Sequence, residues 1–176
     1  MKNMENQTVK LKDDREVVLR LLMSEDKDNL LSMFTVMSEK ALLWSNPPYD
    51  EQKIDRWMTG VGTGLSIVAS FKDRIVGISA VYQMPKPREK GISSMMIYIH
   101  QDFHGVGLGA EMTSILLELA KDKGLHRVGL EVVEDNIAAV NLYKKMGFEI
   151  EGVIREGYFG ADGKYHNVMV MGILFS

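Results

Sequence analysis

The sequence predicts a mixed α/β fold in which a mostly antiparallel central sheet carries helices on both faces and includes one parallel βαβ unit. Two observations lead to this class. Apolar runs separated by polar turns indicate strands over residues 65–71, 75–82 and 92–100. An amphipathic helix over 107–123 separates the last of these from an apolar strand at 127–133, and such a crossover joins parallel strands.

The N-terminal part predicts a hairpin followed by a helix. Strands over 9–11 and 16–22 flank a short charged turn. Ser24 is the predicted N-cap of the following helix, because a serine side chain can accept from a free backbone N–H of the first turn. Apolar residues recur at helical spacing up to Met37, so we expect this helix to end near Lys40.

The next segment predicts a loop over 42–49 and a second helix. The loop contains Trp44 and two consecutive prolines, and Asp50 is placed to cap a helix with Trp57 on its apolar face. Loops on a rigid scaffold often carry binding residues, so acceptor selection is predicted within residues 40–64. The alternative is that both tryptophans belong to the core.

The C-terminal part predicts one more helix and a closing hairpin. Asp135 or Asn136 is expected to start the helix. Residues 148–158 and 164–174 are predicted to form the two strands of this hairpin, and Asp162-Gly163 between them is a turn signal. Tyr158 and His166 in this hairpin are candidates to line an acceptor pocket, although surface positions are the default.

Composition narrows the function classes. The chain has 176 residues, which predicts a single domain over 1–176. A net charge of −3 gives no electrostatic reason to expect nucleic acid or an anionic membrane as partner. The absence of cysteine excludes disulfides and a cysteine nucleophile, and the four histidines lack zinc-ligand spacing. No metal is expected, and a cytoplasmic location is predicted because no signal or membrane segment is evident.

Three alternating glycines form the most informative feature. Gly105, Gly107 and Gly109 follow an apolar strand and open an amphipathic helix. Such a loop can direct successive N–H groups at an anion, and the helix start adds its positive dipole end. We interpret it as a pyrophosphate cradle. The Walker pattern is absent, whereas the dinucleotide pattern is formally met by Gly105, Gly107 and Ala110, with Glu131 downstream. Residues 100–104 separate strand from glycine, which argues against that reading.

The same stretch resembles the GCN5-related N-acetyltransferases (GNAT). Their central motif is Gln/Arg-x-x-Gly-x-Gly/Ala, and here His104, Gly107 and Gly109 stand at its fixed positions, with histidine in place of the usual arginine or glutamine. The downstream sequence is similar to the family pattern L-x-V followed by N-x-x-A-x-x-L-Y-x-x-x-G-F. The matching residues are Leu130, Val132, Asn136, Ala139, Leu142, Tyr143, Gly147 and Phe148. The likeness covers about residues 65 to 175.

This resemblance implies a GNAT-like fold that binds acetyl-coenzyme A (acetyl-CoA). In the family the glycine loop binds the pyrophosphate, and the pantetheine arm pairs with strand backbone exposed where the parallel strands splay apart. The coenzyme-binding residues so implied are Ile97, Ile99, His104, Gly105, Val106, Gly107, Leu108, Gly109, Asn136 and Tyr143. Asn136 has a second interpretation as a helix cap only.

Acetyl transfer to an amine needs an acid and a base, and the chain offers one candidate for each. The family uses the tyrosine at position 143 as general acid; a tyrosine with a pKa of about 10 protonates a thiolate at a cost of about 2 kcal/mol. Glu131 is the candidate base, because it alternates with Val128, Leu130 and Val132 and should point away from their face. Structural roles remain open for both. Backbone N–H groups near Ile99 and His100 are expected to stabilise the oxyanion.

The predicted function is direct acetyl transfer from acetyl-CoA to a primary amine, most simply a small amine or an amino acid. The Leu-Glu-Val strand also resembles ribosomal-protein alanine N-acetyltransferases, so a peptide N-terminus is an alternative acceptor. A non-catalytic acyl-CoA sensor and an NAD-binding protein are alternatives from other classes. A homodimer is left open.

Overall fold

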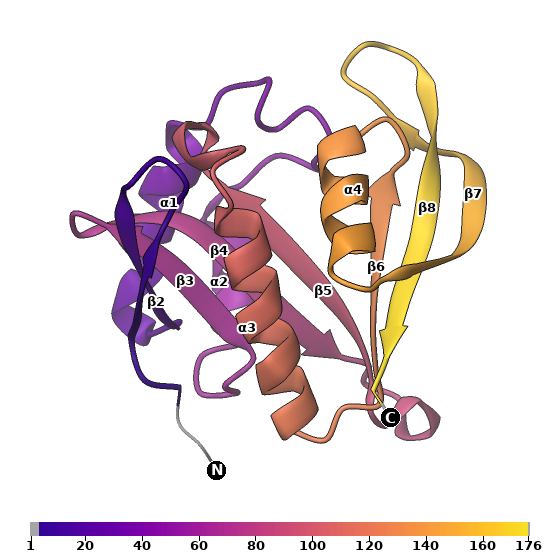
Figure 1. The fold of residues 1–176 in the computed structure, drawn as a ribbon. Coiled ribbons are helices and arrows are strands. Elements are labelled where there is room, and N and C mark those ends of the chain that lie inside the picture. Colours follow the sequence, from indigo (N-terminus) through magenta and orange to yellow (C-terminus); the bar gives the residue numbers. More distant parts are fainter. Residues whose placement is uncertain (1–3, 176) are drawn as a thin grey trace.

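The computed structural model describes residues 4–175, whose strands form one eight-stranded sheet in the order β1-β2-β3-β4-β5-β6-β8-β7 (Figure 1). Neighbouring strands are antiparallel except β5 and β6, which are parallel, as predicted. The strands are β1 (Gln7–Lys10), β2 (Glu16–Leu21), β3 (Ser66–Phe71), β4 (Arg74–Gln83), β5 (Ile92–Ile99), β6 (Arg127–Val133), β7 (Glu149–Phe159) and β8 (Tyr165–Leu174). The α-helices are α1 (Lys27–Thr35), α2 (Glu51–Met58), α3 (Leu108–Asp122) and α4 (Ile137–Lys145).

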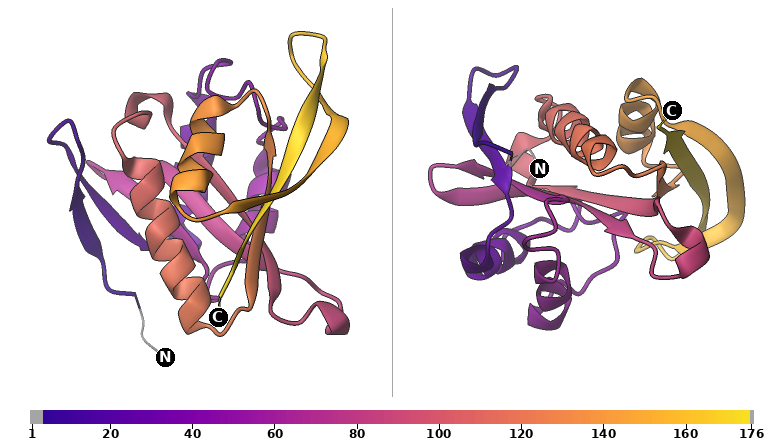
Figure 2. Two further views of the ribbon diagram at one scale, coloured as in Figure 1. Left: turned by 45° about the vertical axis from the view of Figure 1, so that its right-hand side comes forward. Right: turned by 90° about the horizontal axis from the view of Figure 1, so that it is seen from below.

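Helices cover both faces of the sheet, which confirms the predicted layers. Viewed along the sheet, α3 and α4 lie on one face and α1 and α2 on the other (Figure 2). Successive strand residues point to opposite faces, so each helix pair has its own apolar cluster. Met112 and Leu116 of α3 belong to the larger cluster, together with Val128, Leu130 and Val132 of β6. Leu30 of α1 and Ile54 of α2 belong to the smaller one.

The parallel strands β5 and β6 separate halfway along their length. Their pairing runs from Ile92–Arg127 to Ser94–Gly129 and stops there, although both strands continue. Beyond this point β5 stays bonded to β4 and β6 stays bonded to β8. The sheet therefore opens at its centre, beside the start of α3 and of α4 (Figure 1).

Two predictions about the first helix are wrong. Ser24 begins a short 3-10 turn rather than capping the helix, and α1 starts at Lys27 after Asp26, whose carboxylate is buried against Arg20 (2.7 Å). The helix ends at Thr35 and not near Lys40. After the helix, backbone groups bond to a distant side chain instead of to the next helical turn. The Gln101 side chain accepts from Ser38 N–H (3.2 Å) and donates to the Val36 carbonyl (3.1 Å).

Candidate active site

The glycine loop adopts a backbone that side chains would strain. Gly105 and Gly107 have φ angles of 73° and 94°, and Gly107 is the residue that precedes α3. A Cβ on Gly109 would come within 3.1 Å of Leu142 on α4 and 3.4 Å of Ile99 on β5. The glycines therefore let the loop curl tightly, and they bring the start of α3 close to β5 and α4. This geometry suits an anion at the helix N-terminus.

His104 does not extend toward the space in front of this loop. Its Nε2 lies 2.7 Å from the carbonyl oxygen of Ile99. Since a carbonyl only accepts, Nε2 carries the proton and donates it back to the end of β5. His104, the residue that departs from the family motif, therefore bonds through Nε2 to the protein's own backbone.

The open edge of β5 carries the backbone groups of Ile97 and Ile99. His100 N–H donates to the Val76 carbonyl (2.9 Å), and the Ile92 carbonyl accepts from Met84 N–H (3.0 Å). Even-numbered residues of β5 thus bond toward β4, so odd-numbered residues point their N–H and C=O groups toward β6. Beyond Ser94, no strand within residues 4–175 pairs with them on that side.

This alternation corrects one prediction about the oxyanion donors. His100 N–H already donates to β4, so it is not free to stabilise developing charge. Ile99 N–H points to the open edge by the same alternation. The remaining backbone candidate of the predicted pair is therefore Ile99.

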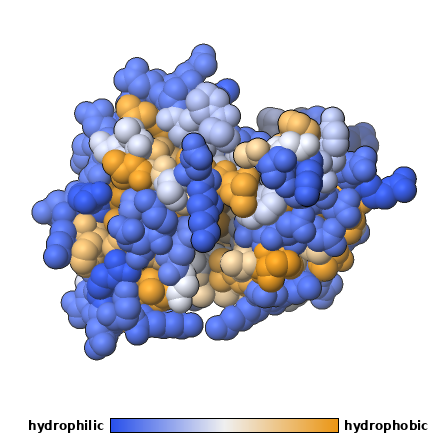
Figure 3. All heavy atoms as spheres, turned by 90° about the horizontal axis from the view of Figure 1, so that it is seen from above, coloured by the Kyte–Doolittle hydropathy of each residue, from blue (hydrophilic) through white to orange (hydrophobic). Residues whose placement is uncertain are grey.

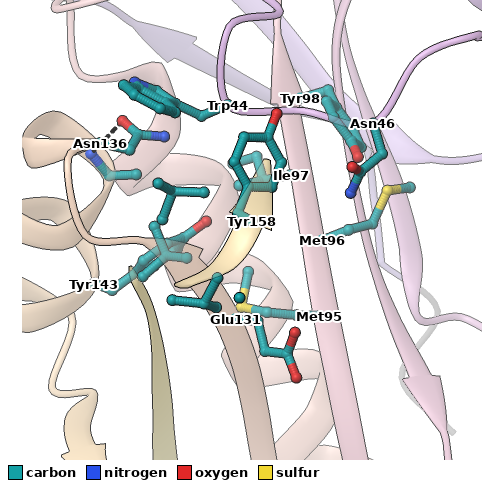
Figure 4. Close-up of a pocket in the computed structure, with 15 residues that line it drawn as sticks. Trp44, Asn46, Met95, Met96, Ile97, Tyr98, Glu131, Asn136, Tyr143 and Tyr158 are labelled. Carbon is teal, nitrogen blue, oxygen red and sulfur yellow. Dashed lines mark hydrogen bonds between the residues drawn. The ribbon is translucent and has the colours of Figure 1, made fainter. Parts of the chain in front are cut away.

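A pocket of about 300 Å³ occupies the opening between β5 and β6 (Figure 4). Seen from the end where α3 begins, hydrophobic residues reach the surface in several places among polar ones, including near the middle of this face (Figure 3). The lining comes from β5, β6, α4, β7, β8 and the loop before α2. The lining residues are Trp44, Asn46, Met95, Met96, Ile97, Tyr98, Glu131, Val132, Val133, Asn136, Ala139, Tyr143, Gly157, Tyr158 and Val168.

Tyr143 enters the pocket from α4. Its ring packs edge-on against Phe148, with the centroids 5.7 Å apart, and the residue is only 8% exposed. The hydroxyl points into the pocket (Figure 4). Burial raises the pKa of Tyr143 to about 12, because the phenolate would lose its hydration. The hydroxyl is therefore protonated at neutral pH, as a proton donor must be.

Glu131 enters from β6 and lies on the opposite face of the sheet from α3 and α4. Val128, Leu130 and Val132 are buried under those helices, whereas Glu131 is exposed, as the alternation predicts. Its carboxylate is the only charged group among the fifteen lining residues. The structure thus brings Tyr143 and Glu131 to one pocket from opposite sides of the opening between the strands.

The other predicted coenzyme-binding residues take several positions. Asn136 lines the pocket and also caps α4, since its Oδ1 accepts from Ala139 N–H at 3.3 Å (Figure 4). Both interpretations of Asn136 are therefore compatible with the structure. The Val106 carbonyl accepts from Lys12 N–H (3.1 Å). Leu108 is fully buried and belongs to the apolar cluster under α3, so its side chain packs in the core.

Tyr158 closes the pocket beside the loop that precedes α2. Its hydroxyl donates to the carbonyls of Leu43 (3.1 Å) and Ser45 (2.9 Å), which ties β7 to the loop before α2. Trp44 in that loop lies edge-on to His166, 5.0 Å between centroids. The alternative that both tryptophans are core residues holds for Trp57, which packs against Tyr98 in the aromatic cluster under α1 and α2, but not for the pocket-lining Trp44.

His166 supports this end of the pocket without lining it. Its Nε2 lies 3.0 Å from Asp162 and its Nδ1 lies 2.5 Å from Asp135. The hydrogen bond with Asp162, and then that with Asp135, raise the pKa of His166 above its usual value. His166, held by these two carboxylates, packs edge-on against Trp44 and so supports the pocket wall that Trp44 forms.

Several lining residues were not singled out by the sequence. Met96 and Tyr98 of β5 and Asn46 of the loop before α2 also line the pocket. The alternation of β5 would have placed Met96 and Tyr98 on one face, but only the opening of the sheet makes that face part of a pocket. Burial raises the pKa of Tyr98 well above its usual range, so this hydroxyl stays protonated. Among residues 4–175, no group of three or more acidic, histidine or cysteine side chains is arranged to hold a metal ion.

A matched pair of glycine substitutions tests the cradle. Gly107→Ala adds a Cβ to a residue whose φ is 94°, which strains the backbone by about 1–2 kcal/mol. The loop relieves this strain by rotating, and its N–H groups then point elsewhere. We expect the dissociation constant for acetyl-CoA, measured by calorimetry, to rise about fivefold or more. Gly163→Ala carries similar strain (φ 74°) in the hairpin turn with open space around it. Equal losses of affinity in the two variants would show that the loop conformation does not matter for binding.

Residues 30–148 match the family model of the acetyltransferase (GNAT) family. A curated L-methionine sulfoximine/L-methionine sulfone acetyltransferase from Pseudomonas aeruginosa is 24% identical over 133 residues, which cover 72% of this chain and 77% of the relative. An L-amino acid N-acetyltransferase from Escherichia coli is 26% identical over 106 residues, covering 60% of this chain and 65% of that protein.

Solved structures show the same fold at low sequence identity. A GNAT-family acetyltransferase from Streptococcus pneumoniae superposes with a TM-score of 0.79 at 24% identity, covering 90% of this chain and 99% of that one. A ribosomal-protein-alanine N-acetyltransferase from Brucella melitensis gives 0.76 at 19% identity (89% and 99%). A protein from Salmonella typhimurium solved with its cofactor acetyl-CoA gives 0.78 at 16% identity (91% and 94%).

Proposed function

This chain belongs to the acetyltransferase (GNAT) family, and from that premise we propose that it transfers an acetyl group from acetyl-CoA directly to the primary amine of a small amine or amino acid. The observation that carries the proposal is the opening between β5 and β6, which Tyr143 and Glu131 enter from opposite faces of the sheet. The glycine loop and the unpaired edge of β5 fit acetyl-CoA, since they offer N–H groups to a pyrophosphate and strand edges to an amide-containing arm.

The proposed roles follow from these positions. Bound acetyl-CoA supplies a thioester carbonyl for attack and a thiol leaving group. Glu131 takes the proton from the incoming ammonium, directly or through water, because its exposed carboxylate faces the side on which Trp44 and Tyr98 line the pocket. Ile99 N–H faces the carbonyl oxygen from the open strand edge. Tyr143, on the α4 side, keeps its proton until the thiolate departs and then donates it.

The closed end of the pocket beside Tyr158 limits the size of the acceptor. The hydrogen bonds from Tyr158 to the loop before α2 join the two walls of the pocket, so that a long peptide would have to break them. The aromatic rings of Trp44, Tyr98 and Tyr158 suit the apolar stem of a small amine, and Glu131 suits its cationic head. The amino-acid acceptors named for two of the relatives support the same class.

A peptide N-terminus is the second candidate acceptor. It is favoured by Glu131 in its Leu-Glu-Val strand and by the likeness to the ribosomal-protein-alanine N-acetyltransferase. An acetylation screen separates the candidates: acetyl-CoA is offered with alkyl and aryl amines, free amino acids, and tetrapeptides with alanine or serine first. We expect turnover with amines or amino acids and little with peptides; the reverse ranking selects the second candidate, and no turnover with any class contradicts both.

Tyr158→Phe tests the closed acceptor end. The variant keeps the ring but loses the bonds to Leu43 and Ser45, which should loosen the pocket wall and raise KM for the best small acceptor about fivefold, as expected for one net hydrogen bond. We expect kcat to change less than KM, because the reacting groups are untouched. Tyr165→Phe is the control, since Tyr165 lies in the same hairpin with 65% exposure. An unchanged KM in Tyr158→Phe would show that the contact does not shape the pocket.

A further inference from the structure

The glycine loop lacks a cationic side chain of its own. From His100 to Ile115 the sequence contains no lysine or arginine, and the first turn of α3 carries the acidic Glu111. His104 donates its Nε2–H to the Ile99 carbonyl. The helix dipole and backbone N–H groups attract a pyrophosphate, but two negative charges there would meet no full positive charge from this stretch.

The turn between β1 and β2 brings Lys12 to the cradle from elsewhere in the chain. Lys12 N–H donates to the Val106 carbonyl (3.1 Å), inside the glycine loop. The Lys12 side chain then runs across Gly107: its Cγ and Cε both lie 3.7 Å from where a Cβ of Gly107 would be. The ammonium is one bond beyond Cε, and it forms no ion pair with the carboxylates of residues 4–175.

Neighbouring contacts hold this turn against the loop. Arg15 donates to the Asp102 carbonyl (2.6 Å) and its guanidinium lies 3.9 Å from the centre of the Phe103 ring. Leu11 is 5% exposed and belongs to the core under α3. In Figure 1 the tip of this hairpin lies beside the loop that leads into α3. The Lys12 stem therefore starts from a fixed backbone, which reduces the entropy lost when its charge pairs with a ligand.

We propose that Lys12 is a coenzyme-binding residue whose ammonium pairs with the pyrophosphate of acetyl-CoA, supplying the charge that the glycine loop and His104 do not. This inference rests on the proposed function only in requiring that the protein bind acetyl-CoA. It assigns the β1–β2 turn a direct part in binding. The turn is separated from the glycine loop by most of the first hundred residues, and the hydrogen bonds from Lys12 to Val106 and from Arg15 to Asp102 hold the two together.

Calorimetric binding to the unreacted protein tests the assignment. Lys12→Met keeps the length of the stem and the backbone bond to Val106, and we expect it to raise the dissociation constant for CoA about tenfold. The same loss is expected for 3′-dephospho-CoA, which retains the pyrophosphate, and the dependence of affinity on salt should become shallower. Lys12→Arg should restore most of the affinity, whereas Lys10→Met, in the same hairpin with Lys10 paired to Asp14, should bind as the wild type does.

The outcomes separate this inference from the proposed function. Wild-type protein that binds no CoA contradicts the proposed function itself. Wild-type affinity in Lys12→Met, with CoA bound normally, overturns only the role of Lys12. A loss seen with CoA but not with 3′-dephospho-CoA would place the ammonium on the 3′-phosphate and also overturn the pyrophosphate assignment.

Discussion

Tyr143→Phe is expected to lower kcat about 100-fold or more while the dissociation constant for acetyl-CoA stays within about twofold. The substitution removes only the hydroxyl, so the edge-on packing with Phe148 and the shape of the pocket remain. The pKa of about 12 makes Tyr143 a weak acid toward a thiolate of ordinary pKa near 8.5. Burial also destabilises the thiolate and so raises the pKa of the thiol, which narrows the difference between the two pKa values when the proton is transferred.

Steady-state kinetics and calorimetry on the same samples measure these two effects separately. Tyr82→Phe is the matched control, because burial also raises the pKa of Tyr82 to about 12, and its buried hydroxyl has no hydrogen-bond partner among the described residues. Tyr82 does not line the pocket. A drop in kcat shared by both variants, or a Tyr143→Phe defect explained wholly by weaker acetyl-CoA binding, would be evidence against Tyr143 as the acid.

Glu131→Gln is expected to lower kcat/KM at neutral pH about 100-fold, with a defect that shrinks as pH rises. Glutamine keeps the shape of the side chain but cannot take a proton. An alkyl amine with a pKa of about 10 is then available only in its small deprotonated fraction near pH 7, and that fraction grows tenfold per pH unit. The variant should therefore approach the wild-type rate toward pH 10.

The pH profile of kcat/KM, measured for both proteins with the best acceptor, decides this point. Glu118→Gln on the exposed side of α3 makes the same chemical change away from the pocket and should leave the profile unaltered. If Glu131→Gln is impaired by one constant factor at every pH, then the carboxylate positions the acceptor rather than removing its proton.

Most of the fold could be predicted from local patterns. Apolar runs between polar turns indicated the strands, and the crossover helix indicated the parallel pair of β5 and β6. The start of α4 at Asn136 follows from an asparagine that can accept from Ala139 N–H. The wrong predictions concern the two ends of α1. At the start, the Asp26 carboxylate pairs with Arg20, and after the end the Gln101 side chain bonds to Ser38 N–H. Neither contact can be predicted from the local spacing of apolar residues.

The sequence by itself determined the glycine loop, the crossover unit and the facing of Glu131, and its resemblance to the family pointed to Tyr143 as the candidate acid. The first three features depend on residues within a few positions of one another, where backbone preference and side-chain periodicity act directly. The tertiary structure decided that β5 and β6 part beyond Ser94, that His104 turns back to Ile99, and that Tyr158 reaches Ser45, 113 residues earlier in the chain. The physical reason is that such contacts depend on the order in which strands join the sheet, and folding selects that order by burying both apolar clusters at once.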